Sequence, residues 1–127
     1  MKIKLSIFAL FIALFIILGG PTASFGQTEQ IVGGYGDADV KDKEVISAAT
    51  FAVKKGAKKG KATITLLSIN KAQMQVVAGL NYELCLEVNV KKSKKSSKQF
   101  VKTVVYRDLK NRYSLTSWMI QQKPDCQ

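Results

Sequence analysis

The feature that most constrains the fold is a strict alternation of apolar and polar residues between Leu80 and Val90. Successive side chains of a strand point to opposite faces of a sheet, so the alternation predicts a strand with one apolar face. That face consists of Tyr82, Leu84, Leu86, Val88 and Val90. A sheet with one apolar face needs a second layer to cover it.

The second layer is predicted to be a helix between Asp39 and Lys55, where apolar residues recur at helical spacing. The expected apolar stripe consists of Val45, Ile46, Ala49, Ala52 and Val53. Asp39 or Asp42 can cap the N-terminus by accepting hydrogen bonds from unpaired backbone N–H groups. A lysine cluster suits the C-terminal end, and Gly56 and Gly60 indicate where the helix stops.

Two further strands are expected after the alternating segment, at Phe100 to Tyr106 and at Tyr113 to Ile120. Asp108 to Arg112 has the composition of the turn between them. Lys91 to Lys98 holds five lysines and three serines and is expected to be a loop.

One long strand, Ala62 to Gln75, is expected before the alternating segment, and the adjacent Leu66 and Leu67 predict a bulge in it. A short first strand can precede the helix between Gln27 and Asp37. The predicted fold class is α+β, with one long helix packed across a four- to five-stranded antiparallel sheet.

Residues 1–26 have the pattern of a secretory signal peptide. Lys2 and Lys4 precede an apolar run from Leu5 to Leu18, and small residues follow it. The run is shorter than the roughly 20 apolar residues of a membrane span. An uncleaved anchor is the alternative. We expect cleavage before Gln27, with 27–127 forming one secreted, extracellular domain that does not stay inserted in a membrane.

The chain has two cysteines, Cys85 and Cys126. Secretion implies an oxidising compartment, so one disulfide is expected, which would tie the C-terminal tail to the sheet. Two free thiols are the alternative.

Histidine is absent from the sequence. Neither a Ser-His-Asp nor a Cys-His nucleophile can therefore be built, and two cysteines without histidine cannot complete a structural zinc site. No glycine-rich phosphate loop stands between a strand and a helix. We expect no catalytic residue, no metal and no cofactor, and predict that the protein is not an enzyme.

The formal net charge is +11, and the lysines at 91–98 contribute to it. Such a run is either solvated charge or a surface for an anionic partner such as a polysaccharide, a membrane or a nucleic acid. No aromatic residue interrupts the run, which argues against base stacking and so against a specific nucleic-acid partner.

Gln75-Val76-Val77-Ala78-Gly79 is uncharged at a place where a hairpin should turn in water. It resembles the Gln-x-Val-x-Gly signature of the cystatins, inhibitors of papain-like cysteine proteases, and Leu80-Asn81-Tyr82 resembles the strand that follows. Ile31-Val32-Gly33-Gly34 resembles the N-terminal trunk of that family, and Phe51-Ala52-Val53 resembles the end of its single helix. The resemblance extends over about residues 31 to 120. The motifs occur in the same order as the expected helix and strands, which strengthens the resemblance.

The resemblance implies a monomer that inhibits papain-like, cathepsin-type proteases reversibly and competitively. The trunk, the QVVAG hairpin and a second hairpin would block the active-site cleft. An uncharged hairpin can enter an apolar cleft at little desolvation cost, and Gly79 permits a tight turn. The implied protease-binding residues are Ile31, Val32, Gly33, Gln75, Val76, Val77, Ala78, Gly79, Leu109 and Lys110.

The sequence departs from the family at the second hairpin, where the usual Pro-Trp is missing. The favoured alignment puts Leu109-Lys110 there and leaves Trp118 in the last strand, on one face with Ser114, Thr116 and Ile120. The rival alignment makes Ser117-Trp118 the loop. Only one disulfide is possible, where secreted animal cystatins have two. The alternative function is a secreted basic binding or antimicrobial module on a cystatin fold, without inhibitory activity.

Overall fold

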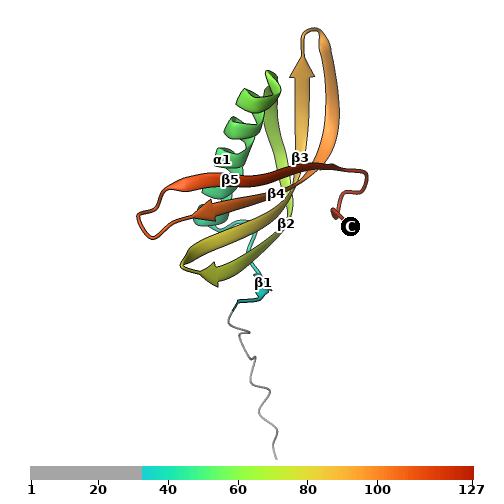
Figure 1. Cartoon of the computed structure of the whole chain (residues 1–127). Helices are drawn as coiled ribbons and strands as arrows, with labels where there is room; N and C mark the ends of the chain where they lie inside the picture. The colour runs from blue at the N-terminus through green and yellow to red at the C-terminus, as the bar shows by residue number, and fades with distance from the viewer. Residues whose placement is uncertain (1–32) are drawn as a thin grey trace, which may run out of the picture.

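The computed structural model describes residues 33–127. One helix packs on a single antiparallel sheet, whose five strands lie in chain order (Figure 1). The elements are β1 (Tyr35–Asp37), α1 (Lys43–Gly60), β2 (Thr63–Val77), β3 (Gly79–Lys92), β4 (Lys95–Arg107) and β5 (Tyr113–Gln121). The predicted α+β fold, with one long helix across an antiparallel sheet, is confirmed.

Helix α1 begins where the sequence predicted but ends later. The Asp42 side chain caps it by accepting a hydrogen bond from the backbone N–H of Glu44 at 2.7 Å. The predicted end of the helical pattern at Lys55 is wrong, because the helix continues past Gly56. It ends at Gly60, the second of the two glycines expected to stop it, and is closed by Lys61 in the left-handed conformation. A Cβ at Gly56 would lie 2.9 Å from the Trp118 ring, so Gly56 provides room for close packing instead of a helix end.

The core lies between α1 and the middle of the sheet. The predicted alternation in β3 is confirmed: Tyr82, Leu84, Leu86 and Val88 are buried, and Val90 packs partly exposed against them. The helix buries Val45, Ala48, Ala49, Ala52 and Val53. The prediction of Ile46 in this stripe is wrong, because Ile46 is 43% exposed and Ala48 takes its place. Three alanines in the stripe allow the helix backbone to approach the sheet closely.

Bulges change which side chains share a face of the sheet. The predicted bulge in β2 is confirmed between Leu66 and Ser68, and Leu67 is exposed there. A further register shift in β2 lies between Ile69 and Lys71. A bulge in β5 skips Thr116, so that Leu115 and Trp118 both pack on the core. Alternation alone predicted that Trp118 shares a face with Ser114 and Thr116. That prediction is wrong, because the bulge places Trp118 on the core face with Leu115. The extra residue in a bulge reverses the side-chain alternation beyond it.

The predicted loop at Lys91–Lys98 is wrong. Strands β3 and β4 continue through it as far as the pair Lys92 and Lys95, and only Ser93 and Lys94 form the turn. All eight side chains from Lys91 to Lys98 are exposed. A hairpin that projects beyond the core keeps its backbone pairing without needing an apolar face, and Figure 1 shows it extending away from the sheet.

The predicted disulfide is present between Cys85 and Cys126, with the two Cα atoms 5.8 Å apart. Cys85 points away from the helix, since its neighbours Leu84 and Leu86 point toward the core. The tail is also held by a hydrogen bond from the Asn70 side-chain amide to the Pro124 carbonyl, 2.9 Å long.

Candidate functional site

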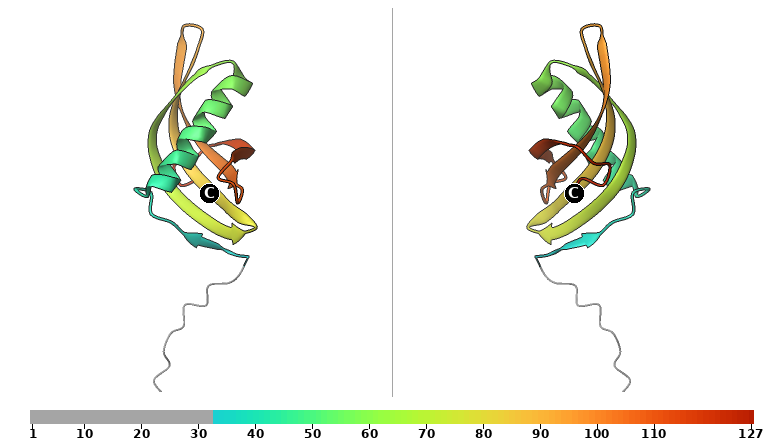
Figure 2. Two further views of the ribbon diagram at one scale, coloured as in Figure 1. Left: turned by 90° about the vertical axis from the view of Figure 1, so that its left-hand side faces the viewer. Right: turned by 90° about the vertical axis from the view of Figure 1, so that its right-hand side faces the viewer.

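Three of the implied binding segments lie at one end of the sheet. Antiparallel pairing places the β2–β3 and β4–β5 turns at the same end, and β1 pairs with the end of β2 through Tyr35 and Gln75. Figure 2 shows β1 and the β2–β3 turn at the end opposite the β3–β4 hairpin, and Figure 1 shows the β4–β5 turn on the same side of the sheet as the β2–β3 turn. We call this end the hairpin edge, made of Gly33, Gln75–Gly79 and Asp108–Arg112.

The tip of the β2–β3 hairpin is exposed and uncharged. Val76 is 63% and Val77 is 40% exposed, and Ala78 is exposed between the two strands. Gly79 has φ of +109°, and a Cβ there would lie 2.3 Å from the Arg107 carbonyl oxygen. The tip can therefore form only with glycine at this position. The apolar residues belong to a surface and not to the core of this domain.

A tyrosine of β4 braces that tip. The Tyr106 hydroxyl donates a hydrogen bond to the Ala78 carbonyl, and its ring lies where a side chain on Gly79 would be. The bond fixes the top of the turn against the strand that leads to the second turn. The sequence predicted no role for Tyr106, because the contact joins residues far apart in the chain.

Gln75 connects the trunk to the same hairpin. Its backbone pairs with Tyr35 on one side and with Asn81 on the other. Its side-chain amide donates to the Gly33 carbonyl, and its side-chain oxygen accepts from the Asn81 amide at 2.9 Å. The sequence did not predict these two side-chain hydrogen bonds or the role of Asn81 in them. Gly33 is thus placed beside the hairpin.

The β4–β5 turn is organised by Asp108. Its carboxylate accepts hydrogen bonds from the backbone N–H groups of Lys110 and Arg112, each at 2.9 Å, and from Arg112 Nε at 2.7 Å. These bonds, the one from the Arg112 backbone most strongly, lower the pKa of Asp108. Leu109 stands at the tip and is 80% exposed. The predicted turn and last strand are confirmed: Leu109 and Lys110 lie in the turn, and Trp118 lies in β5.

A polar network anchors the edge to the start of the helix. Arg107 Nη1 lies 3.1 Å from Glu44 Oε1, and the Tyr82 hydroxyl donates to Glu44 Oε2 at 3.2 Å. Burial is the main cause that raises the pKa of Tyr82 to about 12. Because Arg107 immediately precedes Asp108, the network holds the base of the second turn.

The hairpin edge offers apolar surface and backbone hydrogen-bonding groups. Within residues 33–127, no group of three or more His, Cys, Asp or Glu side chains could hold a metal ion. No helix in that part of the chain is both long and apolar enough to cross a membrane. Ile31, Val32 and the predicted signal peptide lie outside the described residues. The arrangement can occupy a groove of another protein.

The fold and this edge define a class of protein in which one helix supports a sheet that presents an uncharged hairpin. A family model described as SQAPI, aspartic acid proteinase inhibitor, matches residues 38–120. L-cystatin of Tachypleus tridentatus is 41% identical over 87 residues, which are 67% of this chain and 62% of that protein. The chain thus spans less than two thirds of that relative's length.

Solved structures agree on the fold. The salivary cystatin of the soft tick Ornithodoros moubata aligns with a TM-score of 0.60 at 23% identity, over 71% of this chain and 98% of that one. Dimeric human cystatin F aligns with a TM-score of 0.55 at 18% identity, over 79% of this chain and 96% of that one. The chain belongs to the family that the SQAPI model describes, and its relative from Tachypleus tridentatus and its fold place it among the cystatins.

Proposed function

We propose that this protein inhibits papain-like cysteine proteases, of the cathepsin type, reversibly and competitively. The hairpin edge would enter the active-site cleft of the enzyme. The observation that carries the proposal is the exposed, uncharged tip at Val76 to Ala78, which Tyr106 and Gln75 hold beside Gly33. A protein gains nothing from fixing such a tip in water, whereas a preformed tip reduces the cost of binding a partner.

Inhibition would follow from occupation of the cleft. Val76, Val77 and Ala78 carry no charge, so their transfer into an apolar cleft costs little and removes apolar surface from water. Ile31 and Val32, which precede Gly33, would fill two substrate subsites. The closed hairpin presents no peptide bond to the nucleophile of the enzyme, so no covalent intermediate is expected and inhibition is reversible.

The second turn would add a smaller contact. Leu109 supplies apolar surface where the family usually has Pro-Trp, and Lys110 lies beside it. Asp108 fixes the turn through its backbone hydrogen bonds, so Leu109 is held in position before binding.

Inhibition of aspartic proteinases is a second candidate function. The description of the matching family model favours it, and residues 38–120 include both hairpins but not Gly33. An activity that rests on those residues alone would not depend on the trunk, whereas inhibition of a papain-like enzyme would.

We also propose that the protein acts outside the cell as a monomer. The signal-peptide pattern of residues 1–26 and the Cys85–Cys126 disulfide support secretion, because disulfides persist in oxidising compartments. Gel filtration of the secreted chain and sequencing of its N-terminus would test both points. Cleavage before Gln27 and elution as a single subunit are the expected results.

Inhibition kinetics test the main proposal. The chain from Gln27 onward contains the whole described fold. Titrated against papain with a peptide substrate, it should raise the apparent KM without changing kcat, with a Kd between about 1 nM and 1 µM. A parallel titration against pepsin tests the second candidate. No inhibition of several papain-like enzymes at tens of micromolar would contradict the main proposal and favour a non-inhibitory basic binding module.

A further inference from the structure

The end of the molecule opposite the hairpin edge is dense in lysine. The last turns of α1 and the β3–β4 hairpin lie together there (Figure 1). We call this surface the basic face; it consists of Lys54, Lys55, Lys58, Lys59, Lys61, Lys91, Lys92, Lys94 and Lys95. The sequence contains no Asp or Glu from residue 45 to residue 82 and none from 88 to 107. The folded chain therefore brings two uncompensated basic segments to one end.

Helix stabilisation explains only part of this charge. The C-terminus of a helix carries about half a negative charge, which one or two lysines would offset. The described residues contain four salt bridges, and none of them involves a lysine of the basic face. Lys98, next along the hairpin, is paired with Glu87 at 2.6 Å. Like charges that lie close together repel one another and raise the free energy of the folded state. An anionic partner would reduce this repulsion when it binds.

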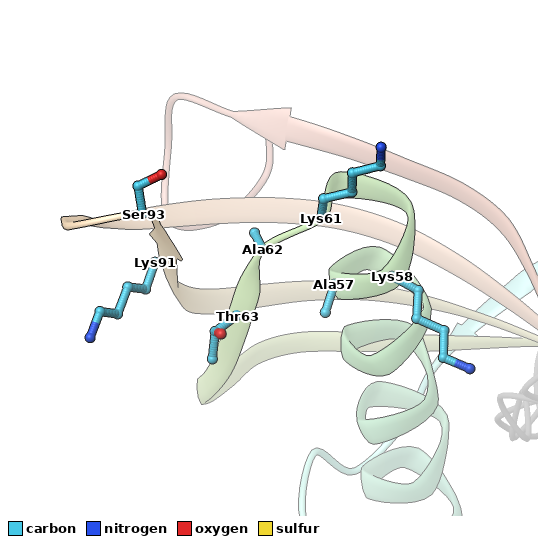
Figure 3. A pocket seen from close by; sticks show the side chains of 7 residues that line it. All are labelled: Ala57, Lys58, Lys61, Ala62, Thr63, Lys91 and Ser93. Atoms are coloured by element: carbon cyan, nitrogen blue, oxygen red, sulfur yellow. The ribbon is translucent and has the colours of Figure 1, made fainter.

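The basic face is hollowed between the helix and the hairpin. A shallow groove of about 620 Å³ is lined by Ala57, Lys58, Lys61, Ala62, Thr63, Lys91 and Ser93. Figure 3 shows Lys58 and Lys61 on the helix side and Lys91 and Ser93 on the hairpin side of the small residues Ala57, Ala62 and Thr63. An adjoining cavity brings Lys59 and Lys92 to its lining in the same way. Lysines from the end of the helix and from the hairpin thus line one groove, and their ammonium groups extend outward from it (Figure 3).

We propose that the basic face binds a sulfated polysaccharide, with one sugar chain lying in the groove between Lys58, Lys61 and Lys91. The ammonium groups would contact sulfates along the chain, and the hydroxyls of Thr63 and Ser93 can bond to sugar oxygens. Ala57 and Ala62 leave the floor low enough for sugar rings to approach. Binding would release counterions from the polyanion, as it does for nucleic acids.

The lining argues against other polyanions. The groove contains no aromatic side chain on which a base could stack. The hairpin turn exposes Ser93 and Lys94, which offer no apolar group to a lipid bilayer. We therefore favour the polysaccharide over nucleic acid and lipid.

The test compares two triple variants of the chain from Gln27 onward. The groove variant is Lys58→Gln, Lys61→Gln and Lys91→Gln. The control variant is Lys41→Gln, Lys71→Gln and Lys123→Gln, three exposed lysines that lie outside the basic face and lose the same charge. Circular dichroism checks that both are folded. Their affinities for a heparin oligosaccharide are measured by calorimetry across a series of salt concentrations.

We expect the groove variant to lose tenfold or more in heparin affinity at physiological salt, and the control variant less than threefold. The slope of log affinity against log salt should fall by about one for each groove lysine removed. Equal losses in the two variants would overturn the proposal, because they would indicate general charge attraction. Tighter binding of the unmodified chain to duplex DNA or to phosphatidylserine vesicles than to heparin would also overturn it.

Discussion

The hairpin edge and the basic face each include a hairpin of the same sheet, yet their chemistry is opposite. The β2–β3 turn exposes Val76 and Val77, which have no charged neighbour in the sequence, while the β3–β4 hairpin exposes five lysines among the eight residues from 91 to 98. The first turn is braced by Tyr106 and Gln75. The β3–β4 hairpin has backbone pairing, one hydrogen bond between the Ser96 and Asn89 side chains and the ion pair of Lys98 with Glu87.

The difference indicates two ways of recognising a partner. Apolar contacts act over short distances and need matching shapes, so a braced tip reduces the entropy lost on binding. Charge acts over about 8–10 Å at physiological salt and tolerates flexible side chains. Substitutions at one end should therefore change one kind of binding and leave the other unchanged.

Val77→Asp should cause the largest change. The variant places an unpaired charge in an apolar cleft, so papain binding should weaken by about 3–5 kcal/mol, a hundredfold or more. The charge stays in water in the unbound protein, so circular dichroism and the denaturation midpoint should not change. Leu67→Asp is the matched control, because Leu67 is 49% exposed at a bulge away from the hairpin edge. An unfolded Val77→Asp variant would mean that the tip contributes to the core.

Trp118→Ala should affect stability and not binding. The ring packs against Gly56 and the core, so truncation should cost about 2–4 kcal/mol, near the lower end for tryptophan because the side chain is partly exposed. The folded fraction should inhibit papain as the unmodified chain does. Leu109→Ala is the counterpart and should reduce affinity with little change in denaturation midpoint. An exchange of the two phenotypes would contradict this assignment.

Removal of the trunk through Val32 should weaken papain binding by about 2 kcal/mol. Full burial of one such side chain is worth about 1.5–3 kcal/mol, and ordering of the segment offsets part of two burials. The loss should appear mainly as faster dissociation in stopped-flow experiments. Equal dissociation rates for the long and short chains would show that the trunk makes no contact. Any inhibition of pepsin should be unaffected.

Tyr106→Phe should have the smallest effect. It removes the hydroxyl that bonds to the Ala78 carbonyl and keeps the ring beside Gly79, so papain affinity should fall by about 0.5–1.5 kcal/mol. Heparin affinity should stay the same, because the residue lies at the other end. A heparin affinity that falls with that of papain would show that the two ends are coupled.

The elements of the fold were predictable where local pattern decides them. The alternation of β3 indicated the core face, and Asp42 was recognised as a helix cap. Of the two glycines expected to stop the helix, Gly60 ends it and Gly56 does not, because only the distant Trp118 explains the glycine at position 56. The bulge at Thr116 was not predicted, because the residues on both sides of it have the composition of a strand and a single skipped residue does not change that composition.

The hairpin edge was predictable in its exposed tips but not in its supports. Val77 and Leu109 are marked by their neighbours in sequence, whereas the contacts of Tyr106 with Ala78 and of Gln75 with Gly33 join separate segments. The lysines of the basic face were visible as two runs. Their convergence depends on the length of α1 and of the β3–β4 hairpin, both of which the sequence underestimated.

The central claim is that the hairpin edge occupies the active-site cleft of a papain-like protease. The most direct measurement is a calorimetric titration of the chain from Gln27 onward into papain, once with an empty cleft and once with the cleft filled by a covalently bound peptide inhibitor. We expect tight binding of one chain to each enzyme with an empty cleft, and no measurable binding when the cleft is filled. Equal affinity for the two forms would contradict the claim, because the chain would then bind elsewhere on the enzyme.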